Sequence, residues 1–88
     1  MASPDALRDE DRRVRQLQIA VGLALGVIAQ GDLAADEAWD MVWATRRAAL
    51  ALFPGKERAF DLIYLPRFLR LLAARYPGNE RVARFLQN

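Results

Sequence analysis

The sequence predicts an all-α fold, a small bundle of four to five helices that begins with a long N-terminal helix. Hydrophobic residues make up 53% of the 88-residue chain, and Ala and Leu, both strong helix formers, dominate them. Apolar side chains recur every three to four residues, as they do on one face of a helix. Pro and Gly stand between these apolar segments and end them. A chain of this length forms one domain, and we assign residues 1–88 to it.

The first helix is expected over residues 4–30. Ser3 suits the cap position before a helix, and Pro4 suits its first turn. Gly31 is expected to end the helix, because Gly tolerates the left-handed backbone that often follows a helix. At 1.5 Å per residue this helix is about 40 Å long, whereas a compact chain of this size is roughly 31 Å across. We therefore expect residues 1–13 to form a protruding or frayed helical arm.

Residues 17–29 are the most apolar stretch of the chain, and they are too few to span a bilayer, which takes about 20 residues. On a helix they form two apolar stripes on nearly opposite sides. One stripe contains Val14, Leu17, Val21, Ala24, Leu25 and Ile28, and the other contains Ile19, Leu23 and Val27, with Gly22 and Gly26 between them. A helix that is apolar on all sides is buried. The segment is therefore either the central helix of the domain or a surface shared with a second subunit, for which the candidate self-association residues are Ile19, Gly22, Leu23, Gly26 and Val27.

A second helix is expected over residues 34–53, ending at Pro54 and Gly55. Asp32 or Asp36 is the expected cap of this helix. Acidic side chains in the first turn also suit the positive end of the helix dipole.

Two tryptophans lie one turn apart on this second helix. Trp39 and Trp43 are followed one turn later by Arg47. The first interpretation is that they are core aromatics, with Arg47 stacked on Trp43. The alternative is a partner-binding face, because Trp and Arg are enriched at binding hot spots.

Three shorter helices are expected after the second, over residues 56–64, 66–76 and 80–87. Pro66 is expected to break or kink the chain, because the residue before a proline, here Leu65, is biased away from helix. Asn79 is expected to cap the last helix. That helix would bury Val82, Phe85 and Leu86.

Most residue types that carry enzyme chemistry are missing. There is no His or Cys, and Ser3, Thr45 and Lys56 are the only Ser, Thr and Lys of the chain. His usually carries acid–base catalysis, and activated Ser, Cys, Thr or Lys carry covalent catalysis. His and Cys are also the preferred zinc ligands. We therefore predict a protein that is not an enzyme and has no cofactor, no metal and no small-molecule substrate.

The expected location is the cytoplasm, because a chain without Cys fits a reducing compartment. A secretory signal peptide is the alternative for the apolar stretch. It is disfavoured because four acidic residues offset the arginines that precede this stretch.

Charge is divided along the chain. Residues 32–45 contain four acids and no basic residue, whereas residues 56–88 contain seven basic and three acidic residues. These segments would pair within one chain, between two copies, or with separate partners. Our hypothesis is a non-catalytic protein–protein interaction or oligomerisation module that forms a homodimer or binds a protein partner. The alternative is a nucleic-acid-binding or regulatory protein, with Arg67, Arg70 and Arg75 as candidate phosphate contacts.

Overall fold

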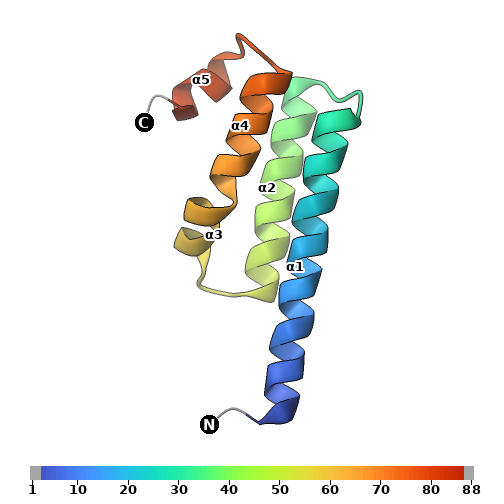
Figure 1. The fold of residues 1–88 in the computed structure, drawn as a ribbon. Coiled ribbons are helices and arrows are strands. Elements are labelled where there is room, and N and C mark those ends of the chain that lie inside the picture. Colours follow the sequence, from blue (N-terminus) through green and yellow to red (C-terminus); the bar gives the residue numbers. More distant parts are fainter. Residues whose placement is uncertain (1–2, 87–88) are drawn as a thin grey trace.

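The computed structural model describes residues 3–86, which form five α-helices joined by short connections (Figure 1). The helices are α1 (Pro4–Gln30), α2 (Ala35–Leu52), α3 (Glu57–Ile63), α4 (Leu65–Arg75) and α5 (Glu80–Leu86). This confirms the predicted all-α bundle and its long N-terminal helix. The first four helices begin and end within one residue of their expected bounds. The expected end of the last helix, at residue 87, lies outside the described residues.

Helices α1, α2 and α4 form the centre of the bundle, with α3 packed on α2 and α4, and α5 packed on α4 (Figure 1). Their facing sides bury a single apolar core. Its largest fully buried side chains are Trp39, Phe68, Ile28, Leu72 and Val42. Each of the three central helices therefore contributes to one core, and this core fixes which side of α1 faces outward.

The N-terminal part of α1 runs past the end of α2 (Figure 1), and every described residue before Leu17 is exposed. The molecule is correspondingly elongated, with principal dimensions of 50 × 27 × 15 Å. The expected cap at the start of α1 is confirmed, because Ser3 Oγ accepts a hydrogen bond from the Ala6 backbone N–H at 3.1 Å. Pro4 occupies the first helical position, where it has no hydrogen bond to lose.

The end of α1 lies where it was expected, but the reason given for Gly31 was wrong. Gly31 has φ −78°, which is extended and not left-handed. Its backbone N–H donates to the Val27 carbonyl at 2.6 Å. A side chain at Gly31 would collide with that same carbonyl oxygen. Glycine is required here by a close backbone approach.

The expected aspartate cap of α2 is also wrong. The cap residue is Ala34, which has no side-chain acceptor, and neither Asp32 nor Asp36 caps the helix. The Glu37 carboxylate instead accepts from the Ala34 backbone N–H at 3.1 Å. An acid in the first turn thus accepts from the backbone N–H of the cap residue, while no cap side chain accepts from the first turn of α2. The helix ends at the expected place, and Gly55 adopts φ 81°, which favours glycine.

The break at Pro66 consists of one residue. Tyr64 alone separates α3 from α4, and the ribbon changes direction there (Figure 1). Pro66 is the second residue of α4, where the missing N–H has no helical partner anyway. Leu65 was expected to lie outside the helix but is its first residue.

The start of α5 confirms the cap expected from Asn79. Its side-chain oxygen accepts hydrogen bonds from the backbone N–H groups of Arg81 at 3.1 Å and Val82 at 3.3 Å. Val82 is buried as expected, whereas Phe85 remains 43% exposed. The side chain of Leu86 lies outside the described residues.

Candidate interaction surfaces

The two apolar stripes of α1 have different surroundings in the folded chain. Val21, Ala24 and Ile28 of the first stripe are buried against α2 and α4, although Val14 of that stripe is exposed. The second stripe is uncovered. Its exposed fractions are 56% for Ile19, 65% for Leu23 and 42% for Val27. Among residues 3–86, α1 is therefore a core helix on one side only, and the expectation that it is covered on all sides is wrong.

The five candidate self-association residues lie together on this uncovered side, which we call the outer face of α1 (Ile19, Gly22, Leu23, Gly26 and Val27). A shallow hollow of about 400 Å³ lies over its glycines and extends to Gly31. A Cβ atom added at Gly22 or Gly26 would meet no other atom within 4 Å. No other helix of the described chain therefore packs closely on these glycines.

The tryptophans belong to the core, as the first interpretation expected, and only Trp43 is partly accessible to a partner. Trp39 is 1% exposed and Trp43 is half-buried, and their rings stack at 6.1 Å between centroids. Phe85 of α5 lies 5.0 Å from the Trp39 ring and 6.1 Å from the Trp43 ring. These aromatic contacts therefore pack α5 against α2. Only part of the Trp43 side chain is exposed.

The arginine beside Trp43 is Arg46, at 5.9 Å from the ring centroid, so the expected stacking of Arg47 is wrong. Arg46 is held there by Asp61 of α3, which accepts from its Nε at 2.8 Å and its Nη2 at 3.0 Å. These hydrogen bonds raise the pKa of Arg46. Arg47 is exposed. The Arg46–Asp61 pair joins residues distant in sequence, and no local pattern in the sequence could have identified it.

The three candidate phosphate contacts differ in their availability. Arg67 and Arg70 are exposed on α4. Arg75 is exposed too, but its Nη2 donates to the Gly31 carbonyl at 2.8 Å, and its guanidinium lies over the Tyr76 ring. Arg75 thus ties the end of α4 to the connection between α1 and α2.

Part of the basic C-terminal third pairs with the acidic segment inside the chain. Arg81 Nη1 lies 3.2 Å from Asp36 Oδ1, and both side chains are largely exposed. Pairs of this kind contribute about 0.2–1 kcal/mol. Intrachain pairing, one of the three possibilities left open by the charge pattern, therefore accounts for one of the four acids between residues 32 and 45.

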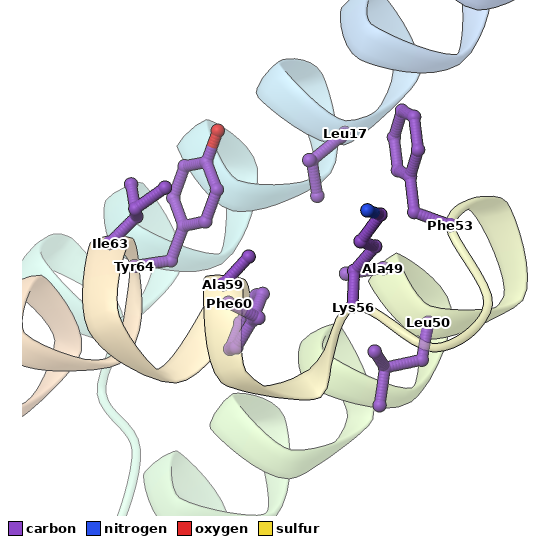
Figure 2. Close-up of a pocket in the computed structure, with 9 residues that line it drawn as sticks. All are labelled: Leu17, Ala49, Leu50, Phe53, Lys56, Ala59, Phe60, Ile63 and Tyr64. Atoms are coloured by element: carbon purple, nitrogen blue, oxygen red, sulfur yellow. The ribbon is translucent and has the colours of Figure 1, made fainter.

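An apolar pocket of about 340 Å³, which the sequence did not predict, lies between α1, α2 and α3 (Figure 2). Leu17 closes it from α1, Phe53 from the end of α2, and Phe60 and Ile63 from α3. The pocket depends on how α3 sits against the α1–α2 pair, so it has no signature along the chain.

Comparisons with known protein families, curated proteins and solved structures found no match. None of the helices between residues 4 and 86 is both long and apolar enough to cross a membrane.

Proposed function

We propose that this protein is a non-catalytic helical oligomerisation module, and that two copies associate through the outer face of α1. The observation that carries the proposal is the exposure of Ile19, Leu23 and Val27 on successive turns of one helix. Single exposed aliphatic residues are common, but contiguous apolar patches on soluble proteins mark interaction sites. Burying these side chains in a second copy would give about 25 cal/mol for each Å² of apolar surface removed from water.

The glycines of the outer face support a close helix–helix contact. Glycine inside a helix costs about 1 kcal/mol relative to alanine. Gly22 and Gly26 incur this cost, although no neighbour between residues 3 and 86 comes close enough to exclude a side chain there. Two helices approach most closely where small residues face each other. A second α1 helix packed over Gly22 and Gly26 would explain why glycine, and not alanine, occupies both positions.

The charges around the outer face favour an antiparallel arrangement of the two α1 helices. Arg12 and Arg15 are exposed and continue this face toward the N-terminus, whereas the exposed Asp32 follows its other end. If Leu23 lies opposite Leu23 of the second copy, Arg12 and Arg15 lie near Asp32 of that copy. The last turn of α1 carries no basic residue, so these arginines would also meet the negative end of the second helix dipole. A parallel pair would place like charges together.

The test of self-association makes the same substitution, Leu→Glu, at two exposed positions on different helices. Leu23 and Leu62 are exposed to nearly the same extent, 65% and 67%, but Leu62 lies on α3. We expect sedimentation equilibrium to show a dimer for the natural protein and for Leu62→Glu, and a monomer for Leu23→Glu. A natural protein that stays monomeric at several hundred micromolar would refute the proposal, as would equal loss in both variants.

The orientation of the helices has its own test, which exploits the absence of Cys from the chain. An equal mixture of Ile19→Cys and Val27→Cys proteins is oxidised and its disulfide-linked products are identified by mass. The antiparallel pair predicts mainly the mixed dimer, because Ile19 then lies beside Val27 of the second copy. A predominance of Ile19–Ile19 and Val27–Val27 links would indicate the parallel arrangement.

Nucleic-acid binding through α4 is the alternative function, and it has less support. Of the three candidates, Arg75 already donates to the Gly31 carbonyl, so Arg67 and Arg70 are the two without a hydrogen bond to the part of the chain that the structure describes. A protein with few phosphate contacts binds nucleic acid weakly, because each contact adds to the affinity by releasing counterions. Retention of the natural protein on heparin at low salt, abolished in Arg67→Gln/Arg70→Gln, would favour this alternative.

A further inference from the structure

The apolar pocket between α1, α2 and α3 has a single charged group among its lining residues, the ammonium of Lys56 (Figure 2). The hydroxyl of Tyr64 is the other polar side-chain group of the lining, and the remaining side chains are apolar. Phe60 at its base is buried, whereas Ile63 at its rim is 59% exposed. The pocket therefore offers an apolar interior that opens beside a cation. Small-molecule sites commonly combine an apolar lining with a few such polar groups.

The charge of Lys56 has no ion-pair partner among the described residues. Among residues 3–86, the ion pairs of the structure do not include Lys56. Asp61, the acid one turn after the start of α3, is occupied by its two hydrogen bonds to Arg46. A second cation stands nearby, because the guanidinium of Arg13 lies 6.0 Å from the centroid of the Phe53 ring that lines the pocket. Glu57, the acid next to Lys56 in the first turn of α3, does not line the pocket. An anionic group in the pocket would therefore meet the positive charge of Lys56.

We propose that this pocket binds a small amphiphilic carboxylate, a single alkyl chain that carries one carboxylate group. The alkyl chain would lie between Leu17, Phe60 and Ile63, and the carboxylate would accept a hydrogen bond from Lys56 Nζ. The volume of about 340 Å³ is at the lower end of the range of about 300–1,000 Å³ typical of small-molecule sites. A chain of medium length fits this volume. This site is independent of the outer face of α1.

The first experiment measures the affinity of the natural protein for hexanoate, octanoate and decanoate by titration calorimetry, below their micelle concentrations. Each CH₂ group that enters the pocket should tighten binding about fourfold, until the pocket is full. Octanol should bind more weakly than octanoate, and octylamine more weakly still. Failure of octanoate and decanoate to bind at millimolar concentration overturns the proposal, as does an affinity independent of chain length.

The second experiment uses a matched pair of cations at the start of α3. Lys56 lines the pocket, and the exposed Arg58 two residues later does not. Lys56→Gln should weaken octanoate binding about tenfold or more, since a hydrogen bond to a charged group is lost, and it should leave octanol binding unchanged. Arg58→Gln should change neither. Equal weakening by both substitutions would show that general charge, not this pocket, attracts the carboxylate, and would overturn the proposal.

A third variant tests the apolar interior. Ala59 is exposed and lines the pocket, so Ala59→Trp fills space without disturbing the buried core. Its circular dichroism should match that of the natural protein, and it should bind neither octanoate nor octanol. Unchanged binding in this variant would place the alkyl chain elsewhere and refute the site.

Discussion

Two isoleucines of α1 provide a direct test of how this helix is built into the molecule. Ile28 is fully buried on the inner stripe, and Ile19 is 56% exposed on the outer face. The same substitution, Ile→Ala, therefore probes two sides of one helix with one change of volume. We expect Ile28→Ala to destabilise the fold strongly and Ile19→Ala to leave the stability of the monomer almost unchanged.

The size of each effect follows from burial. Truncating a fully buried Ile to Ala costs about 2–5 kcal/mol, because apolar contacts are lost and a cavity remains. For Ile19, less than half of the side chain is covered, so the lost burial is about 0.5–1 kcal/mol. The higher helix propensity of Ala offsets several tenths of that. An 88-residue protein has a total stability of about 4–13 kcal/mol, so Ile28→Ala removes a large share of it.

The assay is urea unfolding followed by circular dichroism at two protein concentrations. Association of folded chains makes apparent stability depend on concentration. Ile28→Ala should lose about the same free energy of unfolding at both concentrations. Ile19→Ala should match the natural protein when dilute and fall below it when concentrated, because it loses only the contact with a second copy. The melting temperature of Ile28→Ala should fall by about 4–8 °C for each kcal/mol lost.

One result would refute this reasoning. If Ile19→Ala destabilises the dilute protein as much as Ile28→Ala does, the outer face is covered within the single chain. The helix would then be a central core helix, and the argument for self-association through this face would fail.

Three further predictions concern single contacts, each measured by the same unfolding assay. Gly22→Ala should stabilise the dilute protein by about 0.5–1 kcal/mol, since the surroundings of Gly22 are open and Ala is the better helix former. Gly55→Ala should instead destabilise it by about 1–2 kcal/mol, because φ is 81° at Gly55. If both substitutions changed the free energy of unfolding in the same direction, this reasoning would be contradicted. Asp61→Asn should cost about 1 kcal/mol by weakening the pair with Arg46, and an unchanged midpoint would show that the pair adds nothing. Tyr76→Phe should cost about 1 kcal/mol, because the hydroxyl donates to a carbonyl of the α1–α2 connection at 2.7 Å, and no loss would contradict that role.

Local chemistry explains why the helix bounds were predictable. The Ser3–Pro4 start of α1 and the Asn79 start of α5 depend on side chains within three residues of the helix end. Such contacts are the same in any fold that contains the segment. The failures arose where several local solutions exist. Asp32 or Asp36 was expected to cap α2, but the helix begins after Ala34 and Glu37 accepts from the Ala34 N–H. Acids stand at all three positions, so the local sequence does not distinguish these solutions.

The candidate surfaces were predictable in part. The pattern of residues 17–29 placed Ile19, Leu23 and Val27 together on one side of a helix, and the structure places them so. The pattern did not reveal whether a neighbouring helix of the same chain covers that side. The core position of Trp39 was predicted. The contact of Phe85 with Trp39 was not, because it depends on where α5 folds back.

The sequence by itself determined the helices, their ends and the two apolar stripes of α1, because these depend on neighbours within a few residues along the chain. Only the tertiary structure decided which stripe enters the core, that Arg46 rather than Arg47 reaches Trp43, and that a pocket opens beside Lys56. These outcomes depend on how distant helices pack. A helix with two apolar sides gains burial from either side. The packing of α2 and α4 on one side of α1 leaves the other side exposed.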